Sequence, residues 1–304
     1  MSKKNSPPQW PYIKNRALCL RPLARAPFPT GRPQSDQGIC IELCRLAYSG
    51  SPARIDAALQ TAGMSLEAFI EKDGVEALLV KDSDRLILAY RGTEGNDPRD
   101  FMRDLAVWPR RWSAGGHVMS GFASGVEAVW PQIEKAIAKV EHREGKSLPL
   151  LTTGHSLGGA YAILSGTLKP GAKIISFGAP RVGNRRFNSL IGKQDHVRVV
   201  LGGDVVTRVP PRILPYRHTG TLVYYDHKGD ARPGITREQV KADREQGRRI
   251  HRQGGHSVKK DMILRELSDH ALLNYASAVL GIRVPLPKPA DKAEKDAPKP
   301  PAPR

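Results

Sequence analysis

Short apolar runs alternate with amphipathic segments over most of the chain. Compact runs rich in β-branched residues predict strands at 75–80, 85–90, 148–153, 173–177, 196–201 and 222–225. Helical spacing predicts helices at 39–50, within 51–73, and at 120–140, 157–168 and 261–280, the last with a break near Ser268 and Asp269. Strands that alternate with helices predict an α/β fold, with a mostly parallel central sheet and helices on both faces.

The two ends of the chain differ in composition from its middle. Residues 1–33 contain seven prolines, seven Lys or Arg and no acidic residue, and residues 283–304 contain seven more prolines. The C-terminal segment has too few large apolar side chains to offset its ordering entropy, so it is predicted to be a disordered tail. The N-terminal arm carries Tyr12, Ile13 and Phe28, which predict an extended strap packed on a folded domain at 34–282.

The positive charge is concentrated outside the expected core. Of the formal net charge of +18, the N-terminal arm contributes +7, the C-terminal tail +3 and residues 231–260 a further +6. An anionic membrane surface is the partner that such an excess favours, and a solvated basic surface is the alternative. No aromatic-basic stacking motif or zinc finger accompanies the charge, so no specific nucleic-acid partner is predicted.

The cysteines and the apolar segments bear on compartment and cofactors. Cys19, Cys40 and Cys44 are few and suit a reduced compartment, and the latter two are expected to be small core residues. Neither a metal nor another cofactor is predicted. With no apolar segment typical of a signal peptide or a transmembrane helix, the default expectation is a cytoplasmic protein, with export by a non-classical route as the alternative.

The most informative stretch is Gly154-His155-Ser156-Leu157-Gly158, which follows a predicted strand and precedes a predicted helix. In that context the G-x-S-x-G pattern predicts a nucleophile elbow with Ser156 at its apex. Gly154 and Gly158 lie where a Cβ would collide with the packed strand and helix. The alternative is a buried glycine-rich turn with a capping serine.

A serine nucleophile requires a base and an acid that orients the base. In this architecture the chain order is serine, acid, histidine, and Asp204 is the best acid because it follows a buried strand that ends in two glycines. The candidate bases after it are His218, His227, His251, His256 and His270. His270 is favoured because it opens an apolar helix, with His256 next. His251 is expected to be solvated, His218 to be structural and His227 to lie in a hairpin turn.

An oxyanion hole requires two backbone donors near the nucleophile. Leu157, the residue after the serine, is predicted to supply one of them. Thr93 is predicted to supply the other, because Arg91-Gly92-Thr93 closes an apolar strand.

Together these motifs resemble the class 3 lipases, the family of fungal triacylglycerol lipases and their bacterial and plant relatives. The matching motifs span about residues 40 to 280 and are Arg91-Gly92-Thr93, Asp104-Leu105, Gly121-Phe122, Gly154–Ala160, Phe177–Asn184, Asp204-Val205-Val206 with Arg208 and Pro210, and His218-Thr219-Gly220. The resemblance implies an α/β-hydrolase catalytic domain at 34–282 and a triad of Ser156, Asp204 and His270. It also gives Thr93 the oxyanion role and places a lid helix at 94–108.

The sequence departs from the family in three respects. Met119 stands where many members have a histidine, the segment 226–260 is longer and more basic than a compact member needs, and cysteines for disulfides are scarce. Residues 94–112 are amphipathic and are expected to form either a mobile lid or a permanently packed helix.

The predicted function is serine hydrolysis of carboxylic esters of lipids through an acyl-enzyme. One alternative is a phospholipase A1 that acts on anionic membranes. The other is a non-catalytic binding protein that retains the hydrolase fold.

Overall fold

The computed structural model describes residues 12–24, 26–28, 31–93, 106–191, 195–253 and 264–282, without the side chains of residues 252 and 253. Within these ranges a seven-stranded sheet forms the centre of the molecule, in the order β1-β2-β3-β6-β7-β8-β9. Its strands are β1 (Ser65–Lys72), β2 (Val75–Asp82), β3 (Arg85–Tyr90), β6 (Leu150–His155), β7 (Lys173–Phe177), β8 (His196–Leu201) and β9 (Thr221–Tyr225).

The sheet is mostly parallel, as predicted. The strands from β3 to β9 pair in parallel, while β1 and β2 pair antiparallel with their neighbours. The carboxyl ends of β6, β7 and β8 therefore meet at one edge of the sheet, where chemistry gathers in open α/β sheets. A separate hairpin pairs β4 (Pro109–Arg111) with β5 (His117–Met119).

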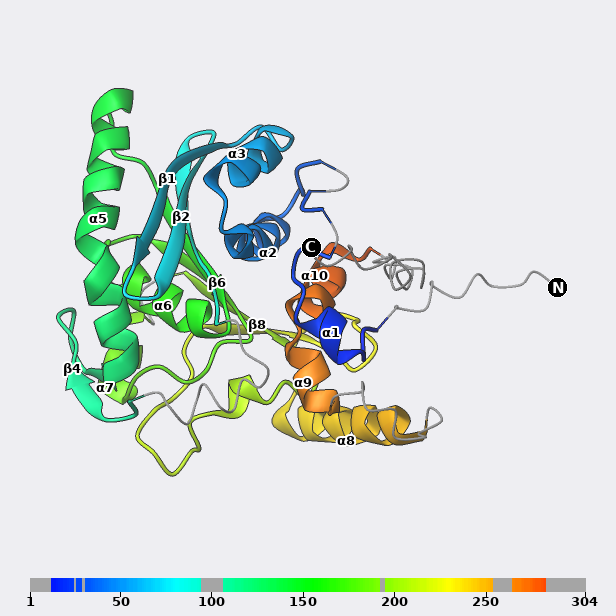
Figure 1. Ribbon diagram of the computed structural model, residues 1–304. Coiled ribbons are helices and arrows are strands. Elements are labelled where there is room, and N and C mark those ends of the chain that lie inside the picture. Colours follow the sequence, from blue (N-terminus) through cyan, green and yellow to red (C-terminus); the bar gives the residue numbers. More distant parts are fainter. Residues whose placement is uncertain are drawn as a thin grey trace, which may run out of the picture.

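Helices cover both faces of the sheet (Figure 1). Two of them, α5 (Ser120–Glu144) and α6 (Leu157–Gly166), pack on one face, and α2 (Asp36–Leu46), α3 (Pro52–Gln60) and α10 (Leu272–Leu280) pack on the other. Alternate residues of β3 accordingly enter two different cores, Leu86 and Leu88 facing α5, and Ile87 and Ala89 facing α2. The remaining helices are α1 (Arg16–Cys19), η1 (Ala47–Ser49), α7 (Arg185–Ile191), η2 (Val206–Arg208), α8 (Arg237–Gln253) and α9 (Arg265–His270).

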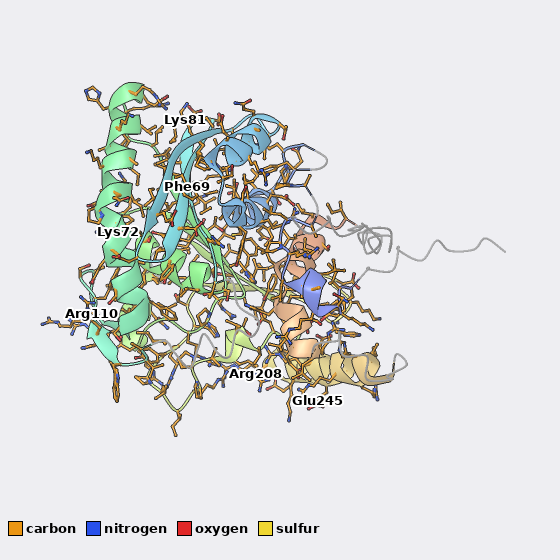
Figure 2. The ribbon with its side chains drawn as sticks, in the orientation of Figure 1. Phe69, Lys72, Lys81, Arg110, Arg208 and Glu245 are labelled. Atoms are coloured by element: carbon orange, nitrogen blue, oxygen red, sulfur yellow. The ribbon has the colours of Figure 1, made fainter. Side chains whose placement is uncertain are left out.

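Two predicted helical segments are confirmed with additions, and the N-terminal strap differs. The short helix predicted within 51–73 is α3, and the same segment continues into β1, a half-exposed edge strand that carries Phe69 and was not predicted (Figure 2). The break predicted near Ser268 and Asp269 lies at Ala271, whose extended backbone (φ −60°, ψ 128°) separates α9 from α10. The N-terminal strap includes the short helix α1, so it is not extended throughout.

Two of the three cysteines belong to the packed interior. Cys40 and Cys44 are fully buried on α2, as predicted, and all three cysteines are free thiols. Of the helices that the structure describes, none has the length and apolar character needed to span a membrane.

Candidate active site

Ser156 lies at the turn between β6 and α6, in the backbone conformation that a nucleophile elbow requires. Its φ of 59° is in the left-handed region, which a non-glycine residue adopts only when its surroundings enforce it. A Cβ on Gly154 would lie 2.1 Å from the carbonyl oxygen of Gly158, and one on Gly158 would lie 2.5 Å from the carbonyl oxygen of Tyr90. Both positions therefore exclude any side chain, as the sequence predicted.

The structure brings Ser156, His270 and Asp204 together. The Oγ of Ser156 lies 2.9 Å from Nε2 of His270, and Nδ1 of His270 lies 3.0 Å from each carboxylate oxygen of Asp204. In the neutral imidazole, Nδ1–H donates to Asp204 and Nε2 accepts the hydroxyl proton of Ser156. Asp204 is fully buried, while Ser156 and His270 are 7% and 6% exposed.

Two residues from distant parts of the chain fix the Asp204 carboxylate. Tyr275 on α10 donates its hydroxyl to Oδ2 of Asp204 at 2.6 Å and accepts the Leu201 N–H at 3.1 Å. Burial, followed by the negative charge of Asp204, raises the pKa of Tyr275 well above its usual value, so the phenol keeps its proton. Gly178 has a φ of +57°, and a Cβ there would lie 2.8 Å from Oδ2 of Asp204.

His155 supports the base from the other side. Its ring lies 4.6 Å from the ring of His270, and its Nε2–H donates to the His270 carbonyl at 2.9 Å. Burial, with the neighbouring His270 adding to it, lowers the pKa of His155 well below 6.5. His155 is therefore a neutral donor that holds the backbone of His270 in place.

Two backbone segments that were predicted to supply an oxyanion hole lie beside Ser156. Leu157 is the first residue of α6, where the N–H has no partner within the helix. A Cβ on Gly92 would lie 3.5 Å from Cβ of Ser156, so the loop that continues into the exposed Thr93 passes directly beside the serine. Both predicted donors thus belong to segments that border Ser156.

A buried ion pair joins the segments that carry Asp204 and His270. The carboxylate of Asp269 accepts the Gly203 N–H at 2.8 Å, Nε–H of Arg265 at 2.9 Å and the hydroxyl of Tyr12 at 2.7 Å. The guanidinium carbon of Arg265 lies 3.9 Å from the centre of the Tyr12 ring. The N-terminal strap therefore contributes the Tyr12 hydroxyl to this network. Paired hydrogen bonds between Ile13 and Asn274 also hold the strap against α10.

The other candidate histidines lie outside this arrangement. Nε2–H of His218 donates to the Thr207 carbonyl at 2.6 Å, and burial lowers the pKa of His218 to about 3, in keeping with the predicted structural role. The prediction that His251 is solvated is wrong, because it is 8% exposed and lies edge-on to Tyr12, with ring centres 6.5 Å apart. His256 lies outside the described residues.

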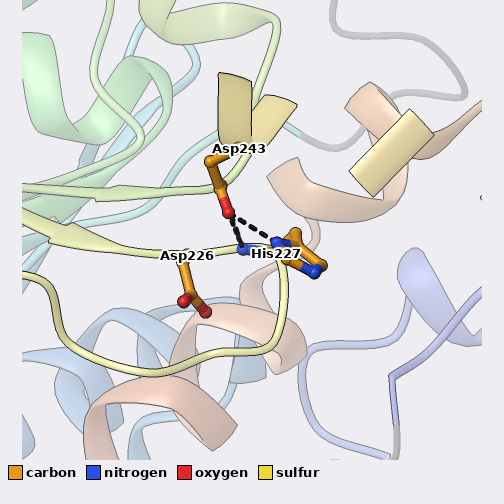
Figure 3. Close-up of side chains that lie close together, drawn as sticks. All are labelled: Asp226, His227 and Asp243. Carbon is orange, nitrogen blue, oxygen red and sulfur yellow. Dashed lines mark hydrogen bonds and ion pairs between the residues drawn. The ribbon is translucent and has the colours of Figure 1, made fainter. Parts of the chain in front are cut away.

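His227 belongs to a second cluster, with Asp226 and Asp243 (Figure 3). One potential ligand atom from each residue lies within 4.8 Å of the others, so the set could in principle hold a metal ion. The carboxylates of Asp226 and Asp243, however, already accept hydrogen bonds from other groups of the protein. Asp243 bonds the His227 ring and the Tyr224 hydroxyl, and Asp226 accepts the N–H groups of Lys228 and Asp230. These bonds tie α8 to the turn after β9.

The predicted lid region is only partly described. Residues 94–105 lie outside the described residues, and residues 109–111 form β4, so the second half of the amphipathic segment is not helical. Trp112 is buried and donates its Nε1–H to Thr167 at 2.7 Å, whereas Trp108 is exposed.

The contacts of several supporting residues carry no signal in the sequence. Tyr275, Asp269 and Gly178 reach the site from segments that are 26 to 71 residues away from Asp204. Their contacts become visible only once the strands and helices are placed.

Comparisons with known proteins agree with this architecture. Residues 87–214 match the family model described as Lipase (class 3). A chloroplastic phospholipase A(1), DAD1, of Arabidopsis thaliana is 40% identical over 119 residues, which cover 34% of this chain and 27% of that protein. A secreted mono- and diacylglycerol lipase of Fusarium solani is 34% identical over 165 residues, covering 51% of this chain and 49% of that protein.

A solved structure shares the fold. The mono- and diacylglycerol lipase from Aspergillus oryzae superposes with a TM-score of 0.56 at 18% identity, covering 63% of this chain and 80% of that chain. The chain spans about half, or less, of the length of the curated relatives named above. The α/β-hydrolase fold and the family resemblance predicted from the motifs are confirmed.

Proposed function

We propose that this chain, whose residues 87–214 match the class 3 lipase family model, hydrolyses carboxylic esters of lipids. The observation that carries the proposal is the chain of contacts from Ser156 Oγ to His270 Nε2 and from His270 Nδ1 to Asp204. A binding protein with the same fold would not need these three side chains in hydrogen-bond reach of one another.

The reaction follows from the geometry. Ser156 Oγ attacks the ester carbonyl while its proton moves to Nε2 of His270, and Asp204 stabilises the imidazolium through Nδ1–H. The N–H groups of Leu157 and Thr93 donate hydrogen bonds to the developing oxyanion. His270 returns the proton to the leaving alcohol, then activates the water that releases the fatty acid from Ser156.

A second candidate function is phospholipase A1 activity on anionic membranes. Two features support it: the similarity to the DAD1 phospholipase and the clustered arginines beside the site. The two functions share the chemistry at Ser156 and differ in the alcohol that leaves, a glycerol hydroxyl or a lysophospholipid.

Hydrolysis of p-nitrophenyl esters of increasing chain length tests the proposal. The wild-type chain is compared with Ser156→Ala and with His270→Ala, and we expect both variants to lose activity by about 10³-fold or more. Gly171→Ala is a matched control. Gly171 lies just before the start of β7, at the end of the strand away from the site, and an added Cβ would meet nothing within 4 Å. Release of fatty acid from phosphatidylglycerol and from diacylglycerol then separates the two candidate functions. A folded wild-type chain that cleaves no ester would favour the non-catalytic alternative.

A further inference from the structure

Two exposed segments beside the candidate active site present apolar side chains to solvent. Trp108 is 76% exposed at the start of β4, and Ile213 is 92% exposed in the loop at 211–215. The Tyr216 hydroxyl donates to the Val107 carbonyl, so the two segments lie side by side. Two large apolar side chains exposed on neighbouring segments offer an apolar contact that a lipid phase could cover.

The backbone beneath these side chains is firmly paired. Gly183 bridges Val118 of β5 on one side and Arg217 on the other, and the Arg217 N–H donates to Gly183 at 2.8 Å. Val107 and Leu214 pack against the same core. The backbone segments that carry the exposed side chains are therefore held in place by hydrogen bonds and core contacts.

Arginines flank the two apolar residues in the sequence, Arg110 and Arg111 after Trp108, and Arg208 and Arg212 before Ile213. Arg208, Arg212 and Arg111 are exposed, and no carboxylate pairs with any of them anywhere in the described chain. Arg110 lies on β4 and pairs with Glu127 at 2.7 Å; in Figure 2 it stands at the left of the molecule, with Arg208 toward the lower centre. We call Trp108, Ile213 and the arginines 110, 111, 208 and 212 the Trp108/Ile213 surface.

The local excess of positive charge is visible in the buried Arg181. Its guanidinium donates to the carbonyls of Arg208 and Pro210. Burial lowers the pKa of Arg181, and the positive charges of Arg212, Arg217 and Arg208 lower it further. The neighbouring side-chain charges that act on Arg181 are therefore positive, and such a cluster attracts an anionic partner.

The surface also lies at the edge of the sheet where the candidate triad sits. Arg181 follows β7 by four residues, and Arg208 follows Asp204 by four. A flat partner seated on the Trp108/Ile213 surface would therefore lie next to the segments that surround Ser156.

We propose that the Trp108/Ile213 surface docks onto bilayers that contain anionic phospholipids. Trp108 and Ile213 enter the interface while Arg111, Arg208 and Arg212 pair with the headgroup phosphates. The proposal rests on the proposed function for its purpose, but docking itself requires no catalysis. A bilayer fits better than a nucleic acid because an exposed isoleucine has no role on a sugar-phosphate backbone, which is recognised through charge and stacking.

Vesicle co-sedimentation of the full chain tests the proposal. The Ser156→Ala background keeps the lipids intact, and vesicles of phosphatidylcholine with phosphatidylglycerol are compared with vesicles of phosphatidylcholine alone. We expect binding only to the anionic vesicles. Arg212→Gln should weaken it about fivefold, and Ile213→Ser about tenfold, from the lost charge and the lost apolar burial. Arg54→Gln on α3 and Leu222→Ser on β9 are exposed controls that should bind as the parent does.

Three results would overturn the proposal: equal binding to both vesicles, unchanged binding by Arg212→Gln and Ile213→Ser, or equal affinity for duplex DNA that Ile213→Ser does not alter. The last would make the surface a general polyanion site. Unfolding midpoints confirm that each variant is folded. Hydrolysis of p-nitrophenyl butyrate by the wild-type chain is measured separately. An inactive chain that binds anionic vesicles would refute the proposed function alone, and an active chain without selective binding would refute docking alone.

Discussion

Replacing Tyr12 with phenylalanine should destabilise the protein, although residue 12 lies more than 140 residues from Ser156 in the sequence. The Tyr12 hydroxyl donates to Asp269 at 2.7 Å, and a hydrogen bond to a charged acceptor contributes about 1.5–3 kcal/mol. Phenylalanine keeps the ring under the Arg265 guanidinium, so the cation–π contact survives. The expected loss in the free energy of unfolding is therefore about 1.5–3 kcal/mol, from this one bond.

Asp269→Asn should lower the free energy of unfolding by more than Tyr12→Phe does. Arg265 and Asp269 have side chains that are only 7% and 1% exposed, and removing one partner of a buried ion pair costs about 3–5 kcal/mol. Because Asp269 also accepts the Gly203 N–H, the variant loosens the segments on both sides of the candidate triad. A shift of about 1 Å there should lower kcat by about 10- to 100-fold, with little change in KM.

Urea denaturation of the wild-type chain, both single variants and the double variant measures the coupling. In the Asp269→Asn background the Tyr12 hydroxyl has lost its charged acceptor, so Tyr12→Phe should cost at least 1 kcal/mol less than it does alone. Additive losses, or a Tyr12→Phe variant as stable and active as the wild-type chain, would refute the idea that the strap holds this network.

Further predictions concern the triad's support and its pH response. Gly178→Ala places a Cβ 2.8 Å from Oδ2 of Asp204, so kcat should fall by at least about 100-fold. The control Gly171→Ala has the same left-handed backbone but open space around the new Cβ, so it should lose only about 1 kcal/mol of stability. Equal kcat in the two variants would contradict this prediction. Tyr275→Phe should lower kcat about tenfold in steady-state kinetics, because Asp204 loses a 2.6 Å hydrogen bond, and an unchanged kcat would count against that role. Burial lowers the pKa of His196 to about 3, so the unfolded chain binds a proton below pH 6.5 that the folded chain refuses, and stability should fall as pH drops from 6.5 toward 3. His196→Gln should reduce that slope by up to about 1.4 kcal/mol per pH unit between pH 6.5 and 5 in urea titrations, and an unaltered slope would contradict the assignment.

The central parts of the fold were predictable because their signals are local. The elbow is encoded in five consecutive residues, and the strands β7 and β8 are short runs rich in isoleucine and valine that are followed by glycines. Asp204 could be proposed from its place after such a strand. The strand–helix alternation then implied a mostly parallel sheet.

The errors occurred where distant segments decide the outcome. Strand β1 contains glutamate, alanine and lysine, which favour helices, and it forms because β2 supplies a full ladder along one edge. His251 lies in a highly charged helix and appears solvated by its neighbours in sequence, yet Tyr12 of the strap covers it. Likewise, nothing near Asp269 in the sequence indicates that it bonds both Tyr12 and Gly203.

The most direct test of the central claim is labelling of the full-length chain with an alkyl fluorophosphonate, followed by peptide mass mapping. We expect one stoichiometric adduct, on Ser156, that is abolished in Ser156→Ala and whose formation is slowed by orders of magnitude in His270→Ala. A folded chain that takes up no phosphonate, or takes it up on another residue, would contradict the assignment of Ser156, His270 and Asp204 as the catalytic triad.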